Sequence, residues 1–154
     1  MAGEYDAIRS AIATKISTSS TCSTAGLVQA DALTGAPMQP PHLRVLQVAG
    51  FDLIDRPNSR MERYRLTIPA ELVVGRPSGL ARSNVVGVNI ARAVQVEFQS
   101  GVKLGGLVDD CWLDGWEAGL QDLVDEEADR RDMDGIRFTF LADVTEYLST
   151  ARTA

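Results

Sequence analysis

The segment from Met61 to Gly75 constrains the fold more than any other part of the chain. From Tyr64 onward every second residue is apolar, namely Tyr64, Leu66, Ile68, Ala70, Leu72 and Val74. A period of two places these side chains on one face of an extended strand. At about 3.3 Å per residue, a strand from Glu62 to Val74 spans roughly 40 Å, about twice the usual length. We therefore predict a long strand that extends beyond the body of a small domain.

Two other segments show the spacing of amphipathic helices, which we predict over Tyr5–Ile16 and Leu80–Gln99. Their apolar residues recur at every fourth position: Ile8, Ile12 and Ile16 in the first, and Val86, Ile90, Val94 and Phe98 in the second. A helix with one narrow apolar face is stabilised by packing rather than by propensity. Both helices therefore require a sheet to pack on.

The remaining strands are shorter. We predict them over Leu27–Leu33, Leu43–Ala49, Leu107–Trp116 and a final segment with Ile136, Phe138, Phe140 and Ala142 on one face. Gly50 is expected to close the second of these strands, and Gly115 to weaken the third or mark a bulge. Small, polar and proline-rich stretches predict turns or loops at Ser17–Thr24, Thr34–Pro41 and Phe51–Arg60.

These elements predict the fold class. We expect an α+β protein, a single domain over residues 1–154, with a mostly antiparallel twisted sheet and two main helices packed on one face. Residues 1–4 and 150–154 are expected to be flexible ends.

Charge and composition exclude several classes of protein. The 154 residues carry a formal charge of −6, which argues against general nucleic-acid binding. Cys22 and Cys111 form no metal-binding pattern with the single histidine, His42, and are expected to be buried thiols. The chain begins without a signal peptide and contains no apolar run of about 20 residues, so no membrane is expected as a partner.

No catalytic constellation is visible. The acidic stretch Asp125–Asp134 resembles part of a calcium loop, but Arg130 and Leu141 stand where that loop requires acids. We interpret the stretch as a solvated loop. Asp109 and Asp110 are neighbours in an extended segment and should point to opposite faces.

A nucleophile is equally weakly supported. Ser78 is displaced by one position from the hydrolase motif G-x-S-x-G, and His42 has no acid placed beside it. Trp112 and Trp116, four residues apart in a strand, are expected to share a face as core or interface anchors. We therefore expect no enzyme activity, no catalytic residue, no cofactor and no metal, and a role in binding or assembly.

Several stretches together resemble a known family. They are E-Y-D-A-I-R-S-A-I at the start, P-P-H-L-R-V-L at Pro40–Leu46, L-V-V-G-R at Leu72–Arg76, S-G-V-K-L-G-G-L-V-D-D at Ser100–Asp110, and I-R-F-T-F in the last strand. This order is similar to that of the tail terminator proteins of long-tailed bacteriophages, especially those of actinobacterial hosts. The resemblance covers about residues 4–145.

The resemblance implies a subunit that assembles as a homohexameric ring in the virion neck, after synthesis in the host cytoplasm. Such a ring caps the tail tube, stops its polymerisation and joins the tail to the head. Its implied partners are the major tail tube protein, a head–tail connector or stopper, and phage DNA that passes through the lumen without specific binding. Another neck component, and a non-viral binding or scaffold domain, are the alternatives.

The candidate interface follows from the long strand. Its polar face and the tryptophans supply the candidate subunit or tube contacts, namely Arg63, Arg65, Pro69, Glu71, Trp112 and Trp116. Because proline cannot donate to a sheet ladder, Pro69 is expected at an edge or bulge. The acidic residues Asp125, Glu126, Glu127, Asp129, Asp132 and Asp134 form a candidate loop that lines the lumen or projects from the ring.

Overall fold

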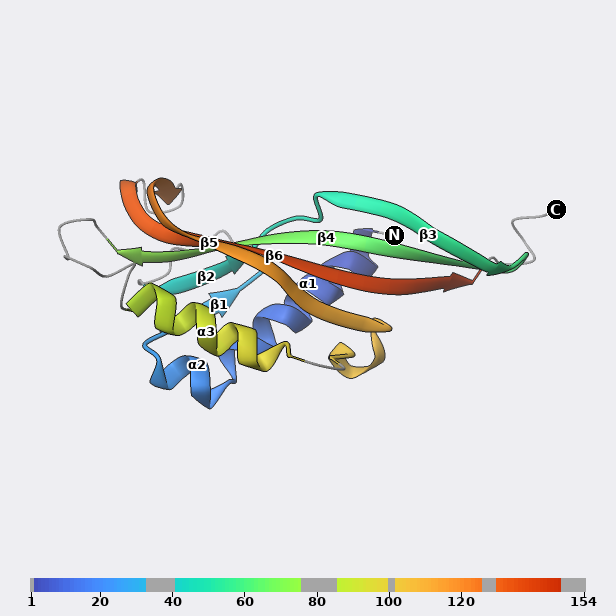
Figure 1. Ribbon diagram of the computed structural model, residues 1–154, viewed down its shortest axis with the longest axis horizontal. Helices are drawn as coiled ribbons and strands as arrows, with labels where there is room; N and C mark the ends of the chain where they lie inside the picture. Colours follow the sequence, from blue (N-terminus) through green and yellow to red (C-terminus); the bar gives the residue numbers. More distant parts are fainter. Residues whose placement is uncertain (1, 33–40, 76–85, 100–101, 126–129, 148–154) are drawn as a thin grey trace.

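The structure of the protein, a computed structural model, describes residues 2–32, 41–75, 86–99, 102–125 and 130–147. Within these ranges the chain forms a twisted six-stranded sheet with its helices on one face (Figure 1). The strand order is β1 (Gln29–Asp31), β2 (His42–Val45), β4 (Met61–Gly75), β6 (Arg130–Tyr147) and β5 (Asp110–Asp125), and β3 (Gly50–Asn58) also pairs with β4. All pairs are antiparallel except β1 with β2. The predicted α+β class is confirmed.

The predicted long strand is β4, which spans Met61–Gly75. It is the central strand of the sheet, because it pairs with β6 along one side and with β2 and β3 along the other. The side chains of Leu66, Ile68, Ala70, Leu72 and Val74 are 0% exposed, so the apolar face predicted from the period of two is the buried one.

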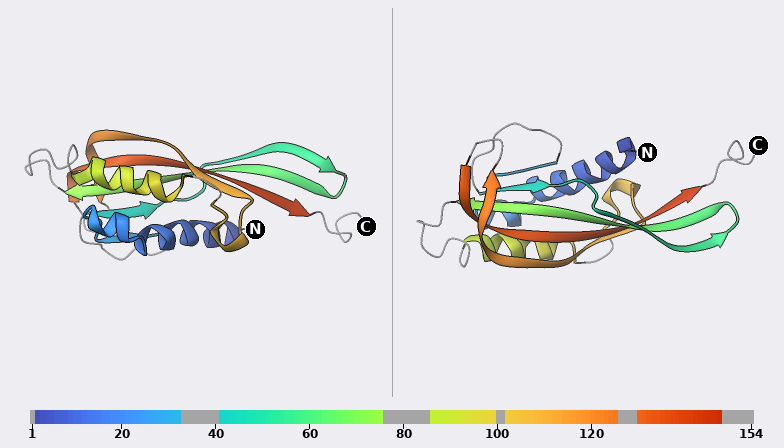
Figure 2. Two further views of the ribbon diagram at one scale, coloured as in Figure 1. Left: turned by 60° about the horizontal axis from the view of Figure 1, so that its bottom comes forward. Right: turned by 90° about the horizontal axis from the view of Figure 1, so that it is seen from above.

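Two helices cover that buried face. Helix α1 spans Ala2–Ser17, and its residues Ile8, Ile12 and Ile16 lie in the core as predicted. Helix α3 spans Val88–Glu97, so the latter part of the predicted Leu80–Gln99 helix is confirmed. Residues 76–85, which include the predicted start, lie outside the described residues. In the part of the chain that the structure describes, no helix lies on the other face of the sheet (Figure 1 and Figure 2), and we call it the open face.

Two predicted turns are ordered elements. Within Ser17–Thr24 the chain forms a short helix, α2 (Ser20–Thr24), because the hydroxyl of Ser19 caps it by accepting a hydrogen bond from the Cys22 amide at 3.1 Å. The segment expected to be a turn before Arg60 contains the strand β3 (Gly50–Asn58), so Gly50 opens a strand rather than closing one. The missed strand mixes apolar and charged residues without alternation, because none of its residues is buried and no core imposes a period on it.

The short strands at the other side of β4 are β1 (Gln29–Asp31) and β2 (His42–Val45). Both lie inside the predicted ranges Leu27–Leu33 and Leu43–Ala49, apart from His42 at the start of β2. Residues 33–40, which hold most of the predicted loop between them, lie outside the described residues.

Strands β5 (Asp110–Asp125) and β6 (Arg130–Tyr147) form a hairpin longer than predicted. Its far end curls out of the plane of the sheet (Figure 2). The register shifts between Leu113 and Gly115, which confirms the predicted bulge. A short 3-10 helix, η2 (Leu104–Gly106), precedes β5, and Gly105 and Gly106 adopt the positive φ values of 69° and 92° that favour glycine.

Pro69 does not lie at a sheet edge, so that alternative is wrong, but the pairing beside it is bulged: residues 46–49 lie opposite only Ile68 and Pro69. It is opposite Thr139 of β6, and its carbonyl accepts a hydrogen bond at 2.8 Å from the Leu46 amide on the other side. The missing N–H of Pro69 faces the same side as that carbonyl. There the chain between β2 and β3, residues 46–49, is irregular, so a central proline interrupts no regular ladder.

A buried arginine joins helix α1 to this irregular connection. Arg9 is only 8% exposed, and its guanidinium donates to the carbonyls of Ala32, Val45 and Leu46 as well as to Asp6. The donor–acceptor distances to Leu46 and Val45 are 2.7 and 3.0 Å. One side chain thus satisfies the carbonyls at the ends of β1 and β2 and fixes α1 against them.

Cys22 and Cys111 are free and buried, as predicted from the sequence. Burial raises the pKa of the Cys111 thiol to about 12 and also raises the pKa of Cys22. A thiol with a raised pKa stays protonated near neutrality and is a poor nucleophile.

Candidate functional site

The open face of the sheet gathers most of the predicted interface residues. Residues directly opposite each other in antiparallel strands share a face. The odd-numbered residues of β4 lie opposite the odd-numbered residues of β6, whose side chains point away from the core. Trp112 of β5 lies opposite Leu141, one of these residues of β6. The open face therefore carries five of the six, namely Arg63, Arg65, Pro69, Glu71 and Trp112.

Trp116 is the exception, and the prediction that both tryptophans share a face is wrong. The bulge at Gly115 inserts one residue into β5, which reverses the facing of Trp116 and Glu117. Trp116 consequently lies opposite Phe138, a core residue that is 1% exposed, and packs against the core from the helix side. Trp112 remains on the open face.

Ion pairs between neighbouring strands run across the open face. Arg63 of β4 makes a two-pronged pair with Asp55 of β3, at 2.9 and 2.8 Å. Arg65 makes a similar pair with Asp143 of β6, at 2.8 and 3.1 Å, and its guanidinium lies 5.0 Å from the centre of the Trp112 ring.

Further along the same strands, Arg137 of β6 approaches Glu71 of β4 at 3.4 Å. The hydrogen bonds from Arg63 also hold the pKa of Asp55 below its ordinary value. The charges of Arg63, Arg65 and Arg137 are thus each compensated by a carboxylate on the adjacent strand. Such a surface suits a polar protein partner better than a polyanion, which needs uncompensated positive charge.

One end of the sheet projects past the helices (Figure 1). We call this part the arm, and define it as β3 with Met61–Tyr64 of β4 and Val144–Tyr147 of β6, which pair with one another. Among the described residues, seven large apolar side chains are exposed, and four of them lie on the arm: Phe51, Leu53, Ile54 and Tyr147. A projecting element that exposes apolar side chains is typical of a contact with another protein.

The acidic stretch Asp125–Asp134 is mostly strand rather than loop, contrary to the prediction. Strand β5 runs to Asp125, and β6 begins at Arg130 and includes Asp132 and Asp134. Extended backbone does not form the tight loop that holds calcium. Glu126, Glu127 and Asp129 lie outside the described residues.

The alternative catalytic interpretations gain no support. Asp109 accepts a hydrogen bond from Thr145, whereas Asp110 accepts from the Cys111 amide, so the two carboxylates do not converge. His42 is 0% exposed and cannot meet a substrate from solvent. Ser78 lies outside the described residues. In the described ranges, no three His, Cys, Asp or Glu side chains are grouped to hold a metal ion.

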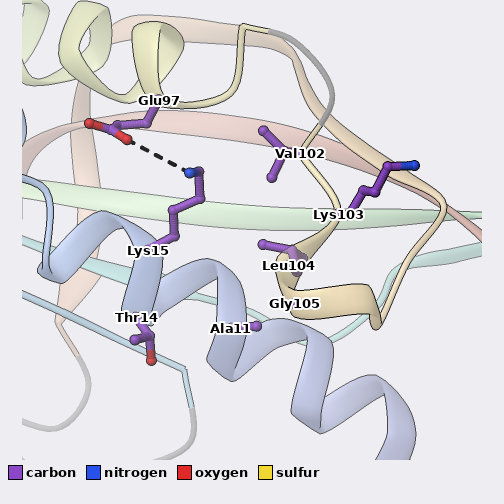
Figure 3. Close-up of a pocket in the computed structure, with 8 residues that line it drawn as sticks. All are labelled: Ala11, Thr14, Lys15, Glu97, Val102, Lys103, Leu104 and Gly105. Atoms are coloured by element: carbon purple, nitrogen blue, oxygen red, sulfur yellow. Dashed lines mark ion pairs between the residues drawn. The ribbon is translucent and has the colours of Figure 1, made fainter.

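A cavity of about 550 Å³ lies between α1, the end of α3 and the segment that follows it (Figure 3). It is lined by Ala11, Thr14, Lys15, Glu97, Val102, Lys103, Leu104 and Gly105. Lys15 pairs with Glu97 at 3.8 Å, and Glu97 also accepts a 2.6 Å hydrogen bond from Ser19. The carboxylate thus links the three helices, which is a structural role.

No helix among the described residues is long and apolar enough to cross a membrane.

The fold defines a class of small α+β proteins in which one long, mostly antiparallel sheet carries its helices on a single face. A chain of the same fold occurs in the solved structure of the virion of a native gene transfer agent particle. The two chains align with a TM-score of 0.57 and 14% sequence identity, over 90% of this chain and 94% of the other. No family model and no curated protein matches the sequence.

Proposed function

We propose that the chain is a structural virion protein, a ring-forming tail terminator that caps the tail tube, stops its polymerisation and joins the tail to the head connector. The observation that carries this proposal is the shared fold with a chain of a gene transfer agent virion, which extends over nearly the full length of both chains. The family resemblance of the sequence points to the same class of protein. Fold similarity alone does not transfer function, so the proposal also needs the surface described above.

The surface supports an assembly role rather than an enzymatic one. The open face and the arm offer one broad polar area and one set of exposed apolar side chains, both suited to contacts with other subunits. A subunit with two different contact surfaces assembles head to tail, and such assembly closes into a ring when the rotation permits it. We assign the homohexamer, the tail tube and the connector as partners, with DNA passing through the lumen.

Charge distribution fits the passage of DNA without binding. Residues 109–134 contain eleven acids and two arginines, a net of −9, whereas the rest of the chain has ten acids and thirteen bases, a net of +3. The two sums give the total of −6. If the β5–β6 hairpin faces the lumen, its acidic residues repel the DNA backbone and keep it from adhering.

The assembly state tests the proposal. Native mass spectrometry of the purified protein is expected to show a six-membered ring, or a monomer that forms rings only on tail tubes. When the purified protein is added to polymerising tail tube protein from the same genome, the tubes seen by electron microscopy should be shorter. A ring that binds the connector but leaves tube length unchanged would support a head–tail stopper instead. A persistent monomer without effect on tubes would contradict both roles.

Charge reversal on the open face tests which surface forms the ring. Arg65→Glu and Glu71→Lys are each expected to preserve the fold, because exposed ion pairs contribute only about 0–1 kcal/mol. Both are expected to reduce ring or tube-end assembly at least ten-fold, measured by native mass spectrometry beside thermal unfolding. Arg92→Glu, on the exposed side of α3, is the matched control. Normal assembly of both open-face variants would remove this face from the interface.

A further inference from the structure

The arm is the least supported part of the sheet. Among the strands that the structure describes, β3 pairs with β4 alone. None of its residues is buried, and its register shifts twice, between Leu53 and Asp55 and between Asp55 and Asn58. Residues 46–49, which connect it to β2, are irregular. Strands with few buried contacts and exposed hydrogen bonds open locally at lower free energy than the core. The position of the arm relative to the helices therefore depends on contacts other than the hydrogen bonds between β3 and β4.

One residue of α1 supplies such contacts to both outer strands of the arm. The ring of Tyr5 packs on Phe51 of β3, with ring centres 5.6 Å apart. Its hydroxyl donates a 2.9 Å hydrogen bond to the Oε1 atom of Glu146 in β6. Tyr5 thus spans β4 and touches the strands on either side of it.

The same face of the arm continues this contact. Phe51 stacks on Tyr64 of β4, with centres 4.4 Å apart and an angle of 14° between the rings. The hydroxyl of Tyr64 donates to Glu62 at 2.7 Å, and Arg56 of β3 pairs with Glu62 at 2.8 Å. An aromatic column and two carboxylate contacts therefore connect the three strands of the arm on the side that faces α1.

The carboxylates explain why a hydroxyl donor is needed there. Glu62 and Glu146 lie directly opposite each other in the antiparallel ladder, where like charges destabilise a strand pair. Tyr64 and Arg56 satisfy Glu62, and Tyr5 donates to Glu146. Of these donors, Tyr5 is the one that belongs to the helix layer.

We propose that Tyr5 is a latch that holds the arm against the first turn of α1, and that the arm opens locally more often when this latch is released. Its ring holds β3 through Phe51, and its hydroxyl holds β6 through Glu146. The latch itself is a property of the single chain. Its consequence for assembly, an arm held in one orientation before it meets a neighbouring subunit, rests on the proposed function.

Hydrogen exchange measured by mass spectrometry on the full chain tests the latch. Tyr5→Ala removes both contacts and is expected to speed amide exchange in residues 50–58 about ten-fold, while residues 42–45 and 88–97 keep their rates. Tyr5→Phe keeps the ring, loses the hydroxyl and is expected to speed exchange near Glu146 about three-fold. Tyr147→Ala, at an exposed tyrosine of the same arm, is the control and should leave both segments unchanged.

Two outcomes would overturn the latch. Wild-type exchange rates in residues 50–58 of Tyr5→Ala would show that the ring does not hold the arm. A uniform increase over all peptides would show that Tyr5 stabilises the whole fold and has no separate action on the arm. Since the measurement uses the single chain, its failure leaves the ring-forming role open, and a failure to form rings leaves the latch open.

Discussion

Ile68→Asp is expected to prevent folding. The Ile68 side chain is 0% exposed and lies opposite Phe140, another fully buried residue, in the centre of the sheet. A carboxylate there loses its hydration and finds no partner, at a cost of about 4 kcal/mol or more. Natural domains are stable by only roughly 5–15 kcal/mol, so most of the stability would be lost. Circular dichroism and soluble yield measure the effect, and Leu66→Asp should behave in the same way.

Thr67→Asp is the matched control for that experiment. Thr67 lies between Leu66 and Ile68 on the same strand but faces the open side, opposite Leu141. The same charge introduced there stays hydrated and is expected to cost about 1 kcal/mol or less. If Ile68→Asp gave soluble protein with the wild-type melting temperature, the assignment of the buried face would be wrong.

Arg9→Leu is expected to cause the second-largest loss, about 2–4 kcal/mol of unfolding free energy. The substitution keeps an apolar stem but removes the donors to the carbonyls of Ala32, Val45 and Leu46. Buried acceptors without donors retain their desolvation cost. Arg9→Lys keeps the charge, but a single ammonium cannot reproduce the planar fork, so an intermediate loss is expected.

Denaturant unfolding followed by fluorescence measures both Arg9 variants. Arg92→Leu is the control, because Arg92 also lies on a helix but is exposed to solvent. We expect less than about 0.5 kcal/mol for the control. Equal losses for Arg9→Leu and Arg92→Leu would show that the buried guanidinium has no special structural role.

The periodic parts of the sequence predicted their structure well. The alternation of Met61–Gly75 identified β4 and its buried face, and the isoleucines of α1 identified the side that meets the sheet. These predictions succeed because burial of one face imposes its own period on the residues, whatever the partner strand is. Arg9 was missed, although it precedes Ile12 by three positions and Ile16 by seven, and so lies on the same face of the helix.

The candidate interface was only partly predictable. The orientation of the Arg63, Arg65 and Glu71 side chains follows from the period of β4. Their ion-pair partners belong to other strands, β3 and β6. The face on which these side chains lie is determined by the local alternation of β4, whereas their ion-pair partners are determined by the pairing of β4 with the other strands. Among the described residues, the exposed apolar side chains of the arm were missed because β3 has no clear alternation.

By itself, the sequence determined the α+β class, the long strand, its buried face and the apolar faces of both helices, because each depends on residues close together in the chain. Tertiary structure decided the rest. One inserted residue at Gly115 separated Trp112 from Trp116, an effect that depends on the register with β6. An irregular neighbouring segment accommodated Pro69 in a central strand. Pairing between distant strands is set by the packing of the whole sheet, and no local pattern encodes it.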